Sequence, residues 1–208
     1  MTLLHHPSED LLLGAAAGRL GAGPSLLIEA HLHACPACRA QLADLEAVGG
    51  ALLDSLPPAP MAEDALARAL AGIERPAPPQ QVNWPLGIDL EGLLKDLPLG
   101  RRRWLGPGMW MRPVLRDSAG VTYLLRSGPG RRLPRHAHTG SEYVCVIKGA
   151  FSDETGRYGP GDFAHSDDSL LHAPATDDEG ECLCLISAEG PMRFQGPLLR
   201  ALQPLLGV

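Results

Sequence analysis

The chain of 208 residues is poor in aromatic residues, which make up 4% of it, although 45% of its residues are hydrophobic. Any core must therefore be built mainly from leucine, alanine and valine. No apolar run approaches the roughly 20 residues that a membrane-spanning helix needs. The opening MTLLHHPSED lacks the basic region and the long apolar stretch of a secretory signal. The sequence therefore predicts a cytoplasmic protein with no membrane partner.

Basic residues are also few, 18 against 24 acidic ones, which gives a formal net charge of −6. Residues 1–75 hold nine acidic and four basic side chains, so phosphate groups would repel this part of the chain. A free-standing DNA-binding regulator is thereby disfavoured, and we expect no direct contact with nucleic acid. An acidic surface suits a basic protein partner, although a merely soluble surface would carry the same charge.

The five cysteines are odd in number, which argues against a disulfide framework. Cys35 and Cys38 form a CxxC pair beside several histidines, a pattern that favours a reducing cytoplasm and thiols kept for metal or redox chemistry. A thioredoxin-type redox pair would need a βαβ setting, whereas the surrounding pattern is helical. Metal binding is therefore the preferred interpretation of this pair.

Helical patterns fill the first 75 residues. Ser8 is a good N-cap for a helix that ends near Gly18, and a second helix is predicted from Ser25 to His33, after the break at GAGP. A third helix begins at Pro36, where the missing N–H costs nothing, and stops at the following proline-rich run. A fourth is predicted from Met61 to Glu74, with apolar residues at helical spacing.

A first set of metal donors lies where the second and third helices meet. His31 and Cys35 are four residues apart, on one face of the second helix, and Cys38 falls in the first turn of the third. The positive end of that helix is expected to lower the pKa of the Cys38 thiol. A closed tetrahedral zinc site needs a fourth donor, for which His5 and His6 are the candidates in this region. Zinc would then tie the helix ends together.

Proline and glutamine dominate residues 76–85, a composition typical of an extended linker. We therefore divide the chain into a helical domain at 1–75, a linker at 76–85 and a β domain at 86–208. Residues 88–97 are ambiguous between helix and strand. From Arg101 onward, strand-like segments alternate with glycine-rich turns and no long helical period follows, which predicts an all-β barrel.

A second set of donors lies within the β domain. His136 and His138 are two residues apart, so on a strand they share one face. Glu142 has the same parity and rejoins that face if the segment between only bends the strand. Two imidazoles and a carboxylate suit zinc, iron, manganese or nickel better than calcium or magnesium. His172, beyond the turn at Gly159–Gly161, is the best candidate for a fourth donor.

The sequence leaves two interpretations open for His165, Cys182 and Cys184, and it predicts a position for Cys145. His165 is either a spare ligand or a histidine satisfied by a backbone hydrogen bond. Cys182 and Cys184 share a strand face and are either small apolar residues or thiols near the metal. Cys145 has the opposite parity to Glu142, so we expect it to pack outside the barrel.

These motifs resemble known families. The spacing of His136, His138 and Glu142 between Gly130 and Gly149 resembles the first cupin motif at every defined position. The GPGD turn and His172 resemble a looser second cupin motif, without its usual Asn after the histidine. The segment HLHACPAC resembles the zinc-binding anti-sigma domain, whose additional N-terminal histidine matches His6. In this order, the two parts resemble the ChrR family of cupin-bearing anti-sigma factors over nearly the whole chain.

The resemblance implies an α+β chain in which an all-α zinc-bound helical bundle precedes an all-β jelly-roll barrel. It implies zinc in both parts, with iron, manganese or nickel as alternatives in the barrel. The predicted ligands are His6, His31, Cys35 and Cys38 in the helical domain, and His136, His138, Glu142 and His172 in the barrel.

The family also implies a function. A ChrR-like protein would be an anti-sigma factor and not an enzyme: it would bind and inhibit a cognate extracytoplasmic-function sigma factor and release it on an oxidative signal of the singlet-oxygen or organic-peroxide type. The alternative is a cupin metalloenzyme, a dioxygenase or isomerase, that carries a regulatory zinc-bound head. Firmly held zinc without turnover would favour the sensor, whereas iron or manganese with turnover would favour the enzyme.

Overall fold

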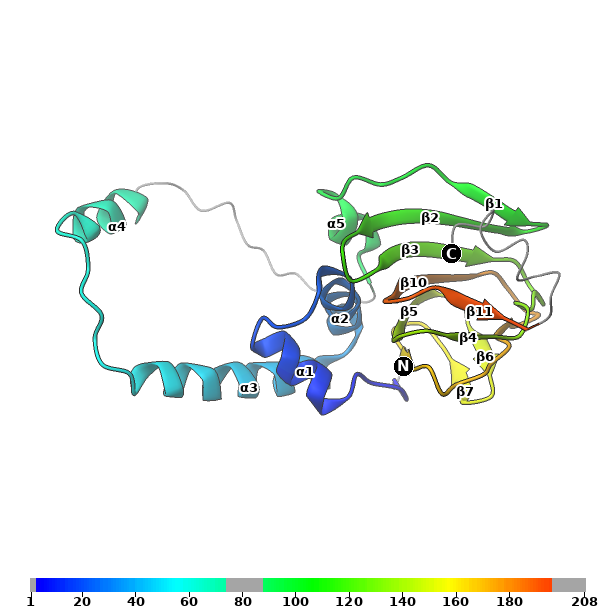
Figure 1. Cartoon of the computed structure of the whole chain (residues 1–208), viewed down its shortest axis with the longest axis horizontal. Coiled ribbons are helices and arrows are strands. Elements are labelled where there is room, and N and C mark those ends of the chain that lie inside the picture. The colour runs from blue at the N-terminus through cyan, green and yellow to red at the C-terminus, as the bar shows by residue number, and fades with distance from the viewer. Residues whose placement is uncertain (1–2, 74–87, 196–208) are drawn as a thin grey trace.

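The computed structural model describes residues 3–73 and 88–195, so the predicted linker at 76–85 lies outside the described residues. Helices precede strands, and the predicted α+β class is confirmed (Figure 1). The helices are α1 (Glu9–Ala16), α2 (Ala22–Ala34), α3 (Pro36–Asp54), α4 (Ala65–Ile73) and α5 (Leu90–Leu94). The strands are β1 (Arg103–Gly106), β2 (Met109–Arg116), β3 (Val121–Ser127), β4 (His136–His138), β5 (Glu142–Lys148), β6 (Phe151–Asp153), β7 (Gly156–Tyr158), β8 (Phe163–Ser166), β9 (Ala175–Thr176), β10 (Cys182–Ala188) and β11 (Met192–Phe194).

The starts of the first three helices follow from their capping residues. The Ser8 hydroxyl accepts a hydrogen bond from the Leu11 N–H at 3.3 Å and caps α1, as predicted. Helix α2 begins earlier than predicted, within the GAGP segment, because Gly21 takes the extended N-cap conformation and Pro24 is tolerated in the first turn. Cys35 caps α3, with Pro36 at its first position.

The helical part does not pack as one compact bundle. Helices α1 and α2 and the beginning of α3 contact one another, but the rest of α3 leads away from the barrel toward α4 (Figure 1). Among the described side chains of α4, none is buried. The fourth predicted helix therefore exists, over a shorter range, but its apolar residues have no core within the described chain.

The strands form a barrel of antiparallel sheets. A six-stranded sheet has the order β1-β2-β3-β10-β5-β8, and smaller sheets β11-β4 and β7-β6-β9 complete the fold. The ambiguous segment at 88–97 contains the short helix α5, which packs near α2. Of the helices in the described part of the chain, not one combines the length and the apolar character that a bilayer crossing requires.

The central strands β3, β10 and β5 of the large sheet are buried along most of their length, which is why they read as nearly continuous apolar runs. Along β5, Tyr143 and Cys145 belong to a core shared with the helices, whereas Val144 and Val146 belong to the core inside the barrel. Cys145 therefore packs outside the barrel, as its parity predicts. Helix α2 covers this outer face and contacts β5 and β10.

One glycine allows that close approach. A Cβ atom added at Gly23 in α2 would lie 2.2 Å from the Ser187 hydroxyl and 2.5 Å from the Thr122 hydroxyl, so a side chain there would push the helix off the sheet. The helical part and the barrel thus share one hydrophobic core, although the sequence treats them as separate domains.

Candidate metal centres

The first donor cluster is formed where the N-terminal segment meets the α2–α3 junction. His6 precedes α1, His31 lies in the last turn of α2, Cys35 caps α3 and Cys38 lies in its first turn. The His6 Nδ1 atom is 3.4 Å from both cysteine sulfurs, and the His31 Nε2 atom is 3.3 Å from the Cys38 sulfur. One donor atom from each of the four residues lies within 4.8 Å of the other three.

This donor set fits a tetrahedral zinc ion. With Zn–N bonds of about 2.0–2.1 Å and Zn–S bonds of about 2.3 Å, neighbouring nitrogen and sulfur ligands are about 3.5 Å apart. The three nitrogen–sulfur distances match that spacing. Two thiols and two imidazoles are also the ligand chemistry of closed structural zinc sites.

Burial favours the uncharged forms of two side chains in the cluster. Burial lowers the pKa of His31 to about 4, which keeps its imidazole neutral and able to act as a ligand. Burial, followed by the hydrogen bond and charge of Cys35, raises the pKa of Cys38 to about 12. The expected lowering by the helix end is therefore wrong, because burial and the second thiol outweigh the helix dipole. A thiolate is stable here only beside a positive ion.

His5 and His6 have different surroundings. His6 faces the two cysteines, whereas the His5 ring lies 4.3 Å from the Tyr158 ring, and its Nε2 atom is 3.1 Å from the Arg157 carbonyl oxygen. The structure thus brings His6 and not His5 to the cluster. Its role as a ligand stays a prediction.

The cluster and the N-terminal segment contact one turn of the barrel, residues 159–163. The His31 Nδ1 atom lies 2.7 Å from the Gly161 carbonyl oxygen, which leaves Nε2 for the cluster. The Asp162 carboxylate accepts hydrogen bonds from the N–H groups of Leu4 and His5 at 3.0 and 3.1 Å. The Phe163 N–H donates to the His5 carbonyl oxygen at 3.1 Å. We call residues 159–163 the docking turn.

The second donor cluster lies inside the barrel and joins strands of different sheets. His136 and His138 belong to β4, which pairs with β11, whereas Glu142 opens β5 in the large sheet. The segment between them is therefore a connection from one sheet to another, and not the bend in a single strand that was the condition for Glu142 to rejoin the face of the two histidines. His172 joins through paired backbone hydrogen bonds with His136, both 3.0 Å long.

All four side chains are at least nine-tenths buried, and one donor atom of each lies within 4.8 Å of the others. The His138 Nε2 atom is 3.2 Å from both the His172 Nε2 atom and a Glu142 carboxylate oxygen. Such spacings match ligands around one metal with bonds of about 2.0–2.2 Å. Three imidazoles and one carboxylate fit zinc, iron, manganese or nickel and do not distinguish among them.

Outer hydrogen bonds orient two of these imidazoles. His136 Nδ1 lies 2.8 Å from the Pro134 carbonyl oxygen and His172 Nδ1 lies 2.9 Å from the Asp153 carboxylate, so each directs Nε2 inward. Burial lowers the pKa of His136. Burial alone would raise the pKa of Asp153, but hydrogen bonds from His172 and Thr155 lower it, so Asp153 is a carboxylate. Within the described residues the buried Nδ1 of His138 has no hydrogen-bond partner.

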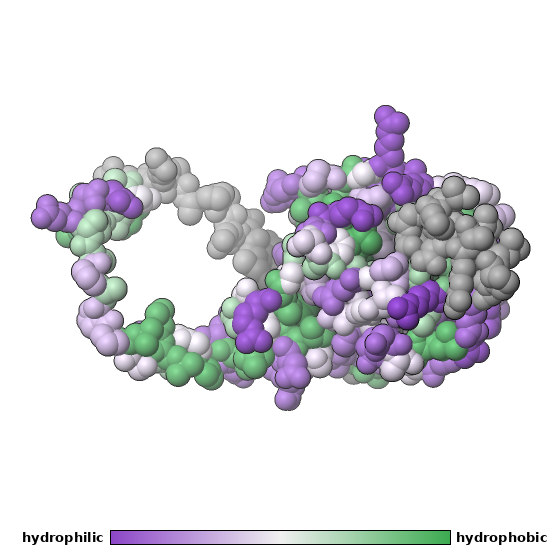
Figure 2. Space-filling view, viewed as in Figure 1, coloured by the Kyte–Doolittle hydropathy of each residue, from purple (hydrophilic) through white to green (hydrophobic). Residues whose placement is uncertain are grey.

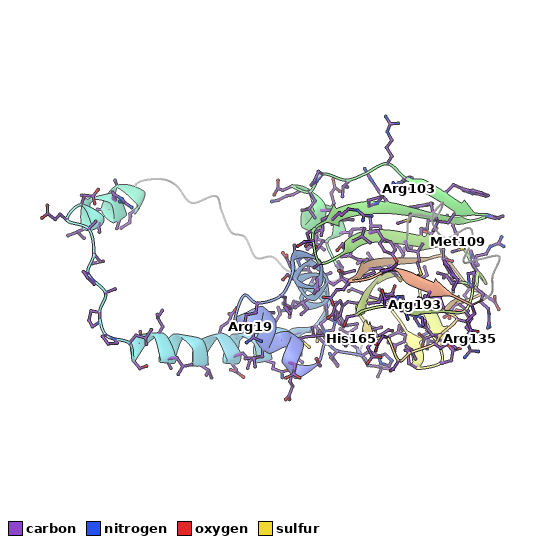
Figure 3. The ribbon with its side chains drawn as sticks, in the orientation of Figure 1. Arg19, Arg103, Met109, Arg135, His165 and Arg193 are labelled. Carbon is purple, nitrogen blue, oxygen red and sulfur yellow. The ribbon has the colours of Figure 1, made fainter. Side chains whose placement is uncertain are left out.

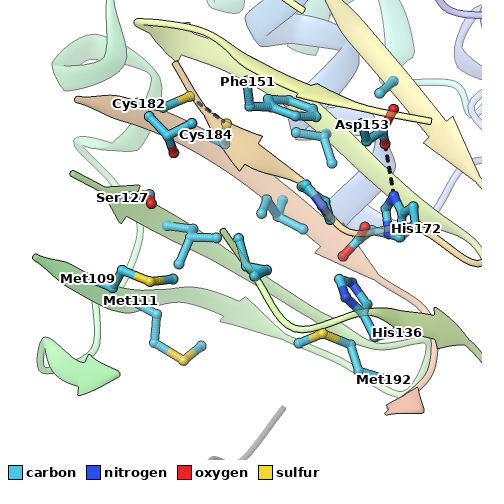
Figure 4. Close-up of a pocket in the computed structure, with 18 of the residues that line it drawn as sticks. Met109, Met111, Ser127, His136, Phe151, Asp153, His172, Cys182, Cys184 and Met192 are labelled. Atoms are coloured by element: carbon cyan, nitrogen blue, oxygen red, sulfur yellow. Dashed lines mark hydrogen bonds and ion pairs between the residues drawn. The ribbon is translucent and has the colours of Figure 1, made fainter. Parts of the chain in front are cut away.

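The remaining candidates lie outside both clusters. His165 is exposed at the surface of the barrel (Figure 3), where it stacks on Tyr143 and pairs with the Ser141 hydroxyl at 3.2 Å. It is therefore not a spare ligand of the cluster, and its partner is a side chain and not a backbone group. Cys182 and Cys184 are free thiols with sulfurs 3.5 Å apart, and both line a cavity that also reaches His136 and His172 (Figure 4).

Sequence reasoning missed three supporting groups. The GPGD motif marks the turn but does not reveal that Asp162 binds the N-terminal segment or that Gly161 meets His31. Asp153 has no sequence signal, because its contact with His172 depends on how a short sheet folds over the barrel. The eight predicted ligands fall into two groups of four, and metal binding by each stays a prediction.

Known proteins share both this architecture and much of the sequence. A family model described as the ChrR cupin-like domain matches residues 101–192. Anti-sigma-E factor ChrR of Cereibacter sphaeroides is 35% identical over 100% of both chains. The crystal structure of Rhodobacter sphaeroides SigE in complex with the anti-sigma ChrR matches at 34% identity with a TM-score of 0.77, covering 90% of this chain and 99% of that chain.

The fold and its two donor clusters define a helical module that could hold one metal, followed by a cupin barrel that could hold another. With the full-length relative, the assignment becomes specific. The chain belongs to the ChrR family of anti-sigma factors. Membership indicates a regulator rather than an enzyme, although cupin folds also include enzymes.

Proposed function

We propose that this chain binds a cognate extracytoplasmic-function sigma factor, inhibits it, and releases it on an oxidative signal received by the cupin barrel. The observation that carries the proposal is the full-length similarity to ChrR, whose structure was determined in complex with SigE. A sigma factor acts with RNA polymerase, so the proposed partner places this function in the cytoplasm. The partner, and not this acidic chain, would contact DNA.

The apolar faces of α3 and α4 support a protein partner. Val48 and Leu52 on α3 are 60% and 65% exposed, and Leu66, Leu70 and Ile73 on α4 are 69%, 55% and 76% exposed. Hydrophobic residues are visible along α3 in Figure 2. Side chains of this size at helical spacing are normally buried, so we propose that the sigma factor covers them in the complex.

The docking turn supports communication between the modules. Gly161 accepts from His31, and its own N–H donates to the Val146 carbonyl oxygen on β5 at 2.8 Å. Strand β5 begins at Glu142, a predicted ligand of the barrel metal. A change at the barrel cluster that moves β5 would therefore shift the turn against which the helical cluster rests. A signal could pass through this contact by altering the balance of two states.

Zinc is the metal that we propose for both clusters. In the helical module a closed structural site would stabilise the fold that binds the sigma factor. Its ligands would be His6, His31, Cys35 and Cys38. In the barrel His136, His138, Glu142 and His172 would hold the sensing metal, for which iron, manganese and nickel remain alternatives. When bound, that metal would supply the reactivity toward oxidants, while the chain's residues hold it beside the cavity.

Co-purification tests the proposal. The full chain should retain a co-expressed sigma factor, and Leu70→Glu should reduce retention at least tenfold while the thermal midpoint stays unchanged. Trp104→Glu is the matched control, because Trp104 is 74% exposed but lies on the barrel. No sigma factor retained by the unmodified chain, or equal loss with both variants, would contradict the proposed surface.

The cavity beside the barrel cluster supports a metalloenzyme as the second candidate function. Its volume of about 340 Å³ would admit a small substrate next to His136, Glu142 and His172. Metal analysis combined with a turnover assay separates the two functions. Iron or manganese with turnover of an organic acid or thiol would favour the enzyme, and retained zinc with none would favour the sensor.

A further inference from the structure

The inside of the barrel holds a cavity of about 340 Å³ that joins the metal-donor cluster to the opposite end of the barrel (Figure 4). Its walls are mostly apolar and include Met111, Leu125, Val144 and Ile186. At about 30 Å³ per non-hydrogen atom, the volume a water molecule takes in the liquid, the cavity has room for on the order of ten such atoms. This is the size of a small amphiphile.

The charges around the cavity limit what can enter. Among the described residues that line it, none is lysine or arginine. The Asp153 carboxylate also lines it, but one oxygen pairs with His172 and the other with Thr155, so neither is left for a ligand. Phosphates and polycarboxylates would lose their hydration with no cationic side chain to compensate for it. Only the donor cluster, once it holds a divalent ion, can attract a single negative head group.

The opposite end of the cavity carries one unsatisfied polar group. Ser127 is 4% exposed, lines the cavity, and its hydroxyl has no hydrogen-bond partner within the described residues. It lies beside Met109 and Cys182, its neighbours across the sheet, and away from His136 and His172 (Figure 4). A buried hydroxyl without a partner is costly, so a ligand oxygen at this end would relieve that cost.

We propose that the barrel binds an aliphatic monocarboxylate of about eight carbon atoms whose far end carries a hydroxyl or carbonyl oxygen. The carboxylate faces the metal-donor cluster, the chain fills the apolar cavity, and the distal oxygen pairs with Ser127. This inference goes beyond the proposed regulation of a sigma factor, because it depends on the cavity, on the metal proposed for the donor cluster and on Ser127, and not on any protein partner.

Calorimetric titration of the metal-loaded full chain with saturated carboxylates provides the first test. Each added methylene should tighten binding about fourfold, as expected for burial of one methylene, from butanoate up to about octanoate. The gain should then stop, because the cavity is full. Octanol, which lacks the charged head, should bind at least tenfold more weakly than octanoate. These measurements on the unmodified chain do not depend on any variant folding.

Paired variants locate the binding. Ala164 lines the cavity, whereas Ala175 is half-buried and absent from its lining. Ala164→Leu should weaken octanoate binding at least tenfold, and Ala175→Leu should leave it within twofold. The unmodified chain should bind ω-hydroxyoctanoate at least as tightly as octanoate, and Ser127→Ala should reverse that order by about tenfold, since the hydroxyl then meets no partner.

Three results would overturn the proposal: no saturable binding of octanoate, affinity that keeps rising through dodecanoate, or equal effects of the two alanine substitutions. Unchanged ligand preference in Ser127→Ala would overturn the role of the distal oxygen. Because binding is measured on the protein alone, failure here leaves the sigma-factor proposal intact. Loss of sigma-factor retention would likewise leave the cavity result standing.

Discussion

Asp162 offers a direct test of whether the barrel positions the helical metal site. Its carboxylate is 6% exposed and accepts hydrogen bonds from the N–H groups of Leu4, His5 and Gly159 at 3.0, 3.1 and 2.9 Å. Two of these bonds fix the segment that carries His6. We expect Asp162→Asn to loosen that segment while the β sheets remain intact.

The magnitude follows from the three bonds. Oδ1 accepts from Leu4 and His5, and Oδ2 accepts from Gly159, so an asparagine leaves either the Gly159 N–H or the two N-terminal N–H groups without an acceptor. The remaining bonds lose the charge that strengthened them. Hydrogen bonds to charged groups contribute about 1.5–3 kcal/mol each, so the loss should be about 2–4 kcal/mol. At about 1.36 kcal/mol per tenfold change, amide exchange at residues 3–6 should accelerate roughly 30- to 1,000-fold.

Hydrogen exchange followed by mass spectrometry measures this acceleration, and a chelator competition measures the rate of metal loss. Both should rise in Asp162→Asn. Asp117→Asn is the control, because Asp117 also accepts from two backbone N–H groups, at 2.8 and 3.0 Å, but in an exposed turn between β2 and β3. Unchanged exchange at residues 3–6, or an equal effect in the control, would refute the positioning role.

Three further outcomes follow from the two clusters. Cys35→Ser or Cys38→Ser should abolish metal binding in the helical module and free the sigma factor. Metal analysis and co-purification measure the two effects, and tight sigma-factor binding by the metal-free variant would contradict the prediction. His136→Ala should leave inhibition intact and reduce only the response to an oxidant, and a reporter assay that showed immediate release would refute that division. The pKa of His31 is lowered by burial from 6.5 to about 4, so the unfolded chain binds this proton more readily. The resulting stabilisation, about 3 kcal/mol, should be complete above pH 6.5 and lost as the pH falls toward 4. Thermal midpoints of the metal-free chain should fall as the pH is lowered across that range, and a flat profile would show that His31 is not buried in solution.

Short-range spacing in the sequence was sufficient to group most of the donors. The spacing of His31, Cys35 and Cys38 is fixed by one helix end and one cap, and local rules predict both. The alternation along β5 also predicted that Cys145 would leave the barrel interior. In contrast, the route from His138 to Glu142 was wrong in detail, because residue parity gives the same facing for a bent strand and for a crossing between sheets.

Contacts between distant segments were beyond such rules. Asp162 is far in sequence from Leu4 and His5, and Asp153 from His172, so no local pattern reports either pair. The pKa of Cys38 also depends on this packing, since burial and a neighbouring thiol outweigh the helix end. The boundaries at 75 and 86 rest on composition alone and stay a prediction, as does the zinc at each cluster.

The shared core changes how a signal could travel between the modules. If only a proline-rich linker joined them, movement in the barrel would be poorly transmitted, because an extended segment has few fixed contacts. The docking turn instead places Gly161 between His31 and Val146, with hydrogen bonds on both sides. At a φ of +89°, with a would-be Cβ 2.8 Å from the Ala34 Cβ, this position leaves little space for a side chain. Packing on the helical side would thus oppose a small displacement of β5. The displaced and the original arrangements of the docking turn would differ in energy by the hydrogen bonds kept or lost. The direct contact is therefore a better physical basis for coupling than the linker.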